Sequence, residues 1–237
     1  MKTSNKILLI SGSSLIGIVI VFMLIFRLTL GNSIVTERLK DSDQSTVFRE
    51  FPLAGFTSIE VSGQWEVELI RGDTIQVKVK GPGDIVESLS VKKRARTLIL
   101  STDKKWRHSK RKVTALITMP SLSDLRLNGL VSLELKGFTS EHLTINTSGV
   151  TSIMGKGNHI RNLNLTGKGV SNLNLRQNSV INADLNYKGV YKIELSMAGG
   201  ELTGKIKGVG KVIYNGEVRK ESIRKEGPNK VIREHEI

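Results

Sequence analysis

Five glycines recur at a nearly constant interval in the C-terminal half of this 237-residue chain. They are Gly129, Gly149, Gly169, Gly189 and Gly208, so successive members stand 20, 20, 20 and 19 residues apart. A period in this range is typical of architectures in which small units are stacked, because one such unit cannot cover its own apolar face. The repeat therefore constrains the fold more than any local helix or strand pattern does.

Apolar residues occupy fixed positions around each glycine. Leu163 and Leu165 precede Gly169 by six and four residues, and Leu173 and Leu175 follow it by four and six. Alternation with a period of two predicts short strands with one buried face. The glycine between two such runs predicts a corner that excludes a side chain. The Val or Leu directly after the glycine is expected to point inward at that corner.

These patterns predict an all-β fold, a parallel β-helix (a β-solenoid) with coils of about 20 residues. Each strand would pair in parallel with its counterpart one coil away, and the rest of the coil would serve as the crossover. The alternative is an antiparallel meander, which needs a tight hairpin about every ten residues. The pair Asn215-Gly216 suits such a hairpin but lies at the end of the array. The parallel arrangement is preferred.

The upstream half follows the same pattern more loosely, with apolar residues of segment 59–69 at the repeat positions around Gly63. The predicted corner glycines are Gly63, Gly129, Gly149, Gly169, Gly189 and Gly208. The predicted domains are a short cytoplasmic tail (1–6), a transmembrane helix (7–26), a polar stalk (27–46), an N-terminal β region (47–121) with a basic projection (92–112), regular repeats (122–216) and a charged C-terminal cap (217–237).

Ile7 to Phe26 is a run of twenty residues without charge, bracketed by Lys6 and Arg27. At about 1.5 Å per residue, a helix of this length spans roughly 30 Å, the thickness of a bilayer hydrocarbon core. The sequence thus predicts an uncleaved signal anchor, and a cleaved signal peptide is the alternative. The short tail favours a single-pass bacterial inner-membrane protein whose residues 33–237 are periplasmic or extracellular.

The net charge of +14 is concentrated in residues 92–112, which hold ten basic residues and one acidic residue. Two basic runs flank a short apolar strand, a pattern that predicts a projection with Trp106 near its tip. Cations around an interfacial Trp suit an anionic lipid or envelope glycan. A solvated loop is the plainer interpretation, and nucleic acid is less expected. The candidate contact residues are Lys92, Lys93, Arg94, Arg96, Lys104, Lys105, Trp106, Arg107, Lys110, Arg111 and Lys112.

Catalytic and metal-binding patterns are weak. The chain has no cysteine, which excludes disulfides and a thiolate nucleophile. Among the acids of residues 120–216, only Glu134 and Glu194 share a repeat position, and they stand three coils apart. The four histidines lack metal-ligand spacing. Glycine-lysine runs at 155–157 and 208–211 lack the spacing of a phosphate loop. We therefore expect that this chain is not an enzyme and that it binds no cofactor and no metal ion.

Two elements resemble a known bacterial family, the putative auto-transporter adhesin, head GIN domain. The opening element is Phe56-Thr-Ser-Ile-Glu-Val-Ser-Gly63, and the closing element is Gly208-Val-Gly-Lys-Val-Ile-Tyr-Asn-Gly216. The resemblance covers about residues 50–216. In the middle units a second glycine of the family pattern is replaced by Val131, Thr151, Ser171 and Tyr191. The resemblance implies a parallel β-helix in the cell envelope, an adhesin-like role and no catalytic residues.

The leading hypothesis is a non-enzymatic, membrane-anchored envelope protein that serves as a binding or adhesion scaffold for an anionic lipid or glycan. The alternative is a structural module that assembles with copies of itself, as a homo-oligomer. A polysaccharide-active enzyme is the third and least favoured interpretation.

Overall fold

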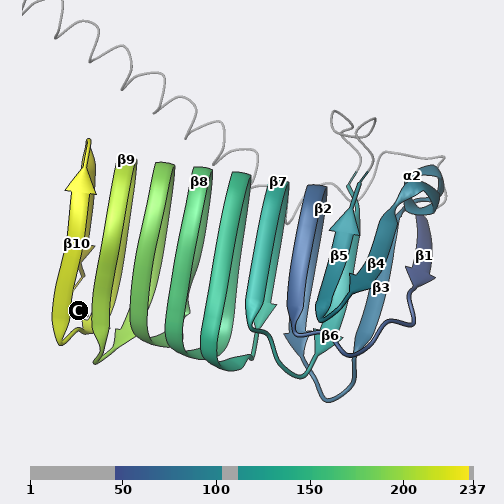
Figure 1. Ribbon diagram of the computed structural model, residues 1–237, viewed down its shortest axis with the longest axis horizontal. Helices are drawn as coiled ribbons and strands as arrows, with labels where there is room; N and C mark the ends of the chain where they lie inside the picture. Colours follow the sequence, from purple (N-terminus) through teal and green to yellow (C-terminus); the bar gives the residue numbers. More distant parts are fainter. Residues whose placement is uncertain (1–45, 103–111, 235–237) are drawn as a thin grey trace, which may run out of the picture. The chain divides into compact units, whose positions relative to one another are not determined.

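The computed structural model describes residues 46–102 and 112–234, which are almost entirely β-strand with one short helix (Figure 1). In chain order the elements are β1 (Thr46–Glu50), β2 (Ser58–Arg71), β3 (Gln76–Pro82), α2 (Gly83–Ser88), β4 (Ser90–Arg94), β5 (Thr97–Ser101), β6 (Thr114–Met119), β7 (Asp124–Lys136), β8 (Thr139–Ala198), β9 (Glu201–Glu217), β10 (Lys220–Glu226) and β11 (Asn229–Arg233).

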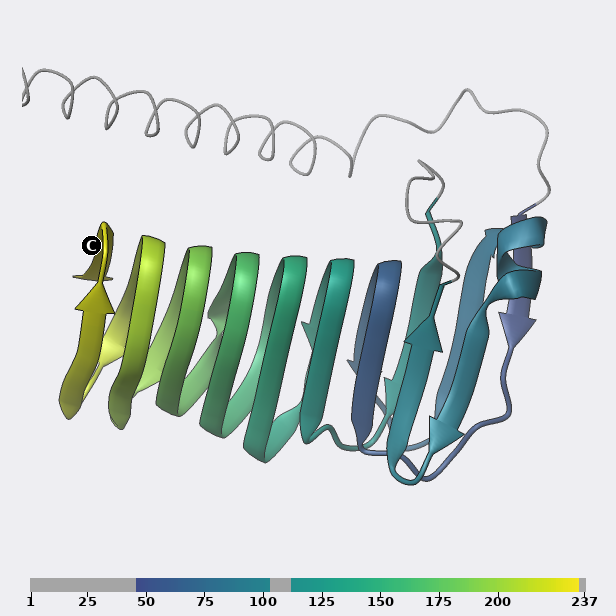
Figure 2. The same ribbon diagram turned by 45° about the horizontal axis from the view of Figure 1, so that its top comes forward.

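The C-terminal part is a stack of repeating units, which we call rungs and name by their glycines. β7 pairs in parallel with β8, so that Gly129 lies opposite Gly149. β8 pairs in parallel with β9, so that Gly189 lies opposite Gly208. β8 extends over 60 residues because the chain bends at each corner and continues as strand into the next rung. Figures 1 and 2 show these rungs side by side as a row of similar ribbons.

Residues after the last predicted repeat continue this stack. β10 and β11 both pair in parallel with β9, so that Ile223 lies opposite Gly204 and Val231 lies opposite Val212. Between these two strands, Gly227 lies against Gly208. The segment that the sequence assigns to a charged cap thus forms one more rung, made largely of exposed polar residues.

The N-terminal part is built differently. β2 is the first rung of the register, with Gly63 opposite Gly129 of β7. On its other side β2 pairs in parallel with β5 and then with β6, two short strands that together occupy the place of one rung. Beyond them the strand direction reverses, because β3 is antiparallel to β6 and β1 is antiparallel to β3. β4 is antiparallel to β5.

The sheet is therefore mixed, and the prediction of a parallel β-helix as the fold class is wrong. Residues 72–121 separate the Gly63 and Gly129 rungs and carry no 20-residue period that would give each strand a partner one coil away. Their strands instead take partners at unequal separations along the chain: β5 and β6 pair in parallel with β2, and β3 pairs antiparallel with β6. Only β4 and β5 are joined locally, by a tight turn at Ala95, where no Asn-Gly pair indicates a hairpin.

The predicted N-terminal transmembrane helix is not supported either. In residues 46–102 and 112–234 the one helix is α2, of six residues, and none there has the length and apolar character needed to cross a bilayer. The charge-free run 7–26, the tail before it and most of the predicted stalk lie outside the described residues. The prediction rests on the length and the apolar character of this run, which by themselves do not establish the structure that the run adopts.

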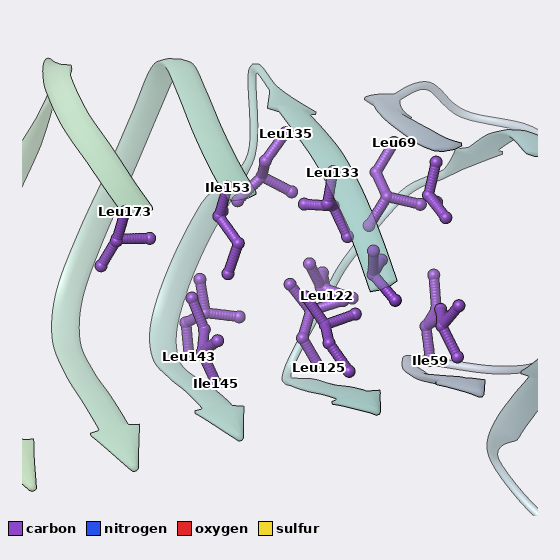
Figure 3. Close-up of a cluster of buried hydrophobic side chains, with 14 of the residues drawn as sticks. Ile59, Leu69, Leu122, Leu125, Leu133, Leu135, Leu143, Ile145, Ile153 and Leu173 are labelled. Atoms are coloured by element: carbon purple, nitrogen blue, oxygen red, sulfur yellow. The ribbon is translucent and has the colours of Figure 1, made fainter. Parts of the chain in front are cut away.

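The core lies inside the stack, where the repeat positions of successive rungs meet. Leu125, Ile145 and Leu165, each four residues before a corner glycine, are at most 2% exposed. Side chains from neighbouring rungs, such as Leu133 and Ile153, point into the same interior (Figure 3). Removing a buried Leu or Ile side chain usually costs about 2–5 kcal/mol, so this continuous column is the main source of stability.

Candidate binding surfaces

A ladder of glycines runs along one corner of the stack. All members have positive φ, and from the second onward each faces the backbone of the glycine one rung earlier. A Cβ on Gly169, for example, would overlap the carbonyl oxygen of Gly149. We call this set the glycine ladder, and its members are Gly63, Gly129, Gly149, Gly169, Gly189, Gly208 and Gly227. These positions pack backbone on backbone and have a structural role.

Gly227 is the ladder member that the sequence analysis missed. It stands 19 residues after Gly208, the same interval that separates Gly208 from Gly189. Ile223 and Val231 keep the apolar positions four residues before and after it, so the spacing and these two residues indicate it, whereas Pro228 replaces the Val or Leu that follows the other corner glycines.

The first half of the predicted basic projection is a hairpin at the surface. β4 and β5 pair antiparallel, with Arg94 opposite Thr97, and Ala95 in the turn has a φ of 50°. Four cations of this hairpin are exposed, and none forms an ion pair with a residue in ranges 46–102 and 112–234. We call them the basic hairpin, namely Lys92, Lys93, Arg94 and Arg96.

The second half of the projection falls mostly outside the described residues. This applies to Lys104, Lys105, Trp106, Arg107, Lys110 and Arg111. Lys112 is described, and its Nζ lies 2.9 Å from a carboxylate oxygen of Glu66. Both side chains of this pair are more than 40% exposed, so the ion pair adds little to stability.

The turn of the basic hairpin lies at one end of β5. Arg96 ends the turn at the start of β5, where its carbonyl oxygen accepts hydrogen bonds from the backbone of Thr57 and Ser58. Thr102 follows the other end of β5 and donates its N–H to Ser62, next to the corner at Gly63. β5 has five residues, so the two ends are separated by about 17 Å. The turn of the basic hairpin therefore lies far from Thr102, the last described residue before the second half of the projection.

Five aliphatic side chains line the outside of the glycine corners. Leu130, directly after Gly129, is 49% exposed, and its valine counterparts in later rungs are partly exposed. The expectation that this residue points inward is wrong, because Leu127 and Val131, both 1% exposed, take the inward sites on either side. Side chains alternate along a strand, so Leu130, directly before the inward-facing Val131, faces out. We call this set the corner ridge: Leu130, Val150, Val170, Val190 and Val209.

Lysines flank the corner ridge in the later rungs. One row, directly before the glycines, contains Lys168, Lys188 and Lys207, and the other, three residues after them, contains Lys192 and Lys211; all five are exposed. Lys192 pairs with Glu194 at 2.8 Å, and Lys207 pairs with Glu226 at 3.4 Å. Lys168, Lys188 and Lys211 have no acidic partner in the described part of the chain.

The two acids that share a repeat position are both held by cations. Glu194, whose side chain is 8% exposed, accepts a hydrogen bond of 2.7 Å from Arg176 Nε. Arg176 also donates to Glu234 at 2.6 Å, and the hydrogen bonds to Glu234 and Glu194 raise the pKa of this guanidinium. Glu134 lies 3.1 Å from Lys136 Nζ. These ion pairs join neighbouring positions of the stack, which is a stabilising role.

Residues 46–102 and 112–234 contain no cluster of three histidine, aspartate or glutamate side chains that could hold a metal ion. His142 and His159 of that part are exposed on different positions of the stack. The candidate binding surfaces of the described residues are therefore the basic hairpin and the corner ridge.

Several solved structures of low sequence identity resemble this chain, and the first of them shares its fold. A putative adhesin from Bacteroides fragilis is 19% identical, with a TM-score of 0.64, and the alignment covers 81% of this chain and 98% of that one. A putative adhesin from Parabacteroides merdae is 13% identical, with a TM-score of 0.49 and coverage of 81% and 98%. A putative lipid binding protein from Parabacteroides distasonis is 16% identical, with a TM-score of 0.48 and coverage of 78% and 96%. None of the curated proteins compared with this chain matches it.

A family model matches residues 55–218, from the loop before β2 to the residue after β9. The match includes both the opening element that ends at Gly63 and the closing element that ends at Gly216, so the resemblance seen in the sequence is confirmed. The chain therefore belongs to the family described as putative auto-transporter adhesin, head GIN domain.

Proposed function

We propose that this chain is a non-enzymatic binding protein of the bacterial envelope, adhesin-like in role, and that its basic hairpin contacts an anionic envelope component, a lipid or a glycan. The family description supports adhesion or binding as the general role. The paired state of Glu134 and Glu194 supports a role without catalysis, because carboxylates held by cations are poorly placed to act as an acid and a base.

The observation that carries the proposal is that four cations without an acidic partner in the described ranges are clustered in one short hairpin, unlike the surface cations that are held in ion pairs. Arg126, Arg161 and Arg219 each lie within 4.0 Å of a carboxylate, so their charge is balanced locally. The four hairpin cations have no such partner in the described ranges and project from one short element. Clustered cations of this kind attract polyanions, and the attraction falls as salt screens it.

The proposal is tested with the full chain in neutral detergent and a soluble sulfated glycan as the anionic probe. Lys92, Lys93, Arg94 and Arg96 are changed together to Ser. We expect the affinity to fall at least about tenfold, since each cation near an anionic surface contributes about 1 kcal/mol. The parent protein should also lose affinity as the salt concentration rises.

A matched control removes four cations that are already paired: Arg126, Arg161, Lys205 and Arg219, each changed to Ser. This variant has the same net charge as the hairpin variant. If both variants bind the glycan equally well, net charge alone governs binding and the role of the hairpin is rejected. Binding by the parent protein that does not depend on salt would reject it too.

A second candidate function is assembly with copies of the same chain. β1 lies at one end of the strand order and pairs only with β3 among the described strands. All five of its residues are exposed, and Phe48 is 65% exposed. An open edge strand with an exposed aromatic residue favours edge-to-edge pairing. Sedimentation of the parent chain and a Phe48→Lys variant tests it: a shift to smaller species in the variant supports assembly, and identical profiles contradict it.

A further inference from the structure

The corner ridge is an apolar line between rows of outward-facing polar residues. The equivalent outward positions three residues before the glycines hold Arg126, Asn146, Thr166, Asn186 and Lys205. The ridge instead holds one leucine and four valines, in register along five successive rungs. With neighbouring strands about 4.8 Å apart, this apolar line is about 19 Å long. Strand propensity alone does not explain it, because threonine suits a strand equally well and would be better solvated.

The ridge is flanked by positive charge and by no negative charge. The rows directly before and three residues after the five ridge glycines contain five lysines and no acid, the remaining positions being Asn or Ser. Three of these lysines, Lys168, Lys188 and Lys211, have no acidic partner in the described ranges. The surface thus combines an aliphatic centre with cationic margins, the same distribution that allows amphipathic elements to lie in the interface of an anionic membrane.

We propose that the corner ridge and its flanking lysines bind the surface of an anionic lipid membrane. Valine and leucine side chains would enter the headgroup region, and the lysines would meet lipid phosphates. A second copy of the same face would bring like charges together. A hydrophilic glycan would gain little from an aliphatic line that offers no aromatic ring to stack on. This surface is separate from the basic hairpin and does not depend on the function proposed for it.

The experiment uses the absence of cysteine from the chain. Val170→Cys in the full chain gives a single site for an environment-sensitive fluorophore on the ridge. Gln177→Cys gives a matched exposed site in the same rung, away from the ridge. Vesicles of phosphatidylcholine with phosphatidylglycerol should shift the emission of the Val170 label to shorter wavelength and leave the Gln177 label unchanged. Vesicles of phosphatidylcholine alone should change neither.

Charge is tested in the Val170-labelled chain by changing Lys168, Lys188 and Lys211 to Ser. All three are exposed, so folding should be preserved, as far-UV circular dichroism can verify. We expect the vesicle concentration for half-maximal shift to rise at least about tenfold. The hairpin variant described above should keep the shift of the Val170 label, so this proposal and the proposed function can fail separately.

Several results would overturn the inference. Equal shifts of both labels would mean that another part of the chain brings the whole protein to the membrane without orienting the ridge. A shift without vesicles that grows with protein concentration would assign the ridge to a second copy. A shift with the soluble sulfated glycan but not with vesicles would assign it to a glycan. An unchanged half-maximal concentration in the lysine variant would remove the role of charge.

Discussion

The N-terminal and C-terminal parts of the described chain form the same kind of interior by different strand arrangements. From β7 onward every rung pairs in parallel with the next at a shift of 20 or 19 residues, and equivalent positions lie above one another. Before β7, the strands β1, β3 and β4 each run antiparallel to a partner, and one layer is made of two separate strands, β5 and β6.

The difference shows what a sequence repeat does physically. A repeat gives each residue an equivalent partner one unit away, so stacking satisfies backbone hydrogen bonds and buries the apolar face of every unit at once. Residues 72–121 have no such repeat, and their strands pair at unequal separations along the chain, with only β4 and β5 joined by a tight local turn. A single change at equivalent positions should therefore have different effects in the two parts.

The largest expected effect comes from adding one methyl group to the glycine ladder. Gly169 and Gly63 both have a φ of 106°. In Gly169→Ala the new Cβ would overlap the backbone of Gly149, which is fixed by strand pairing on both sides. We expect the free energy of unfolding to fall by about 3–5 kcal/mol. In Gly63→Ala it would overlap the Thr102 hydroxyl, which can rotate away, and we expect a loss of about 1–3 kcal/mol.

Urea unfolding followed by circular dichroism measures both losses. Gly157→Ala is the matched control, because Gly157 has a φ of 63° but no atom within 4 Å of a new Cβ. Its expected cost is about 1–2 kcal/mol, from backbone conformation alone. Equal losses in all three variants would show that φ decides the cost and that the contact between rungs does not.

The next effect tests how strongly one rung depends on its neighbours. Asn158 is fully buried, accepts a hydrogen bond of 2.8 Å from the Phe138 N–H and donates one of 2.9 Å to the Leu135 carbonyl. Asn158→Ala leaves both backbone groups without this partner, and we expect a loss of about 2–4 kcal/mol in the free energy of unfolding. Asn164→Ala, at an exposed site, should stay within about 0.5 kcal/mol of the parent. A similar small loss for Asn158→Ala would contradict a role of this side chain in joining rungs.

A smaller effect of opposite sign is expected in the N-terminal part. Ala95 is a residue other than glycine with a positive φ, 50°, in the turn of the basic hairpin. Ala95→Gly should raise the free energy of unfolding by about 0.5–1 kcal/mol, because glycine adopts this conformation without strain. Ala115→Gly, in the buried strand β6, should lower it by about 1 kcal/mol or more. A loss of stability in Ala95→Gly would show that the turn is not strained.

The smallest expected effect is a pH dependence of stability that comes from the ion pairs of Glu226 in the last rung. Hydrogen bonds from Lys205 and then Lys207 hold the pKa of Glu226 below its usual value of 4.5. A depressed folded-state pKa contributes stability above the unfolded value, and this contribution is lost as the pH falls through the folded value. The thermal unfolding temperature of the parent should therefore fall as the pH decreases below about 4.5. The unfolding temperature of Glu226→Gln should fall less over the same interval. Identical pH profiles of the two proteins would contradict the role of this ion pair.

Much of the stack could be predicted because its signals are local in the sequence. The glycine spacing and the period-two alternation around Gly169 correspond to corners with positive φ and to buried strand positions. The outward direction of Leu130 could not be predicted from its apolar character, which suggests burial. Leu130 faces outward because Leu127 and Val131 occupy the inward sites of this corner. The basic run and the strand between its two halves are visible in the sequence, and the structure adds that the first half is a hairpin with an exposed turn at Ala95.

The amino-acid sequence alone indicates the repeating unit: where strands alternate, where a corner needs glycine, and to which family the chain belongs. How the units meet is visible only in the folded chain, including the antiparallel pairing of β1, β3 and β4 and the assembly of five aliphatic residues into one ridge. The physical reason is that periodicity acts between neighbours along the chain. Strand direction and surface continuity depend on contacts between residues that lie far apart in it.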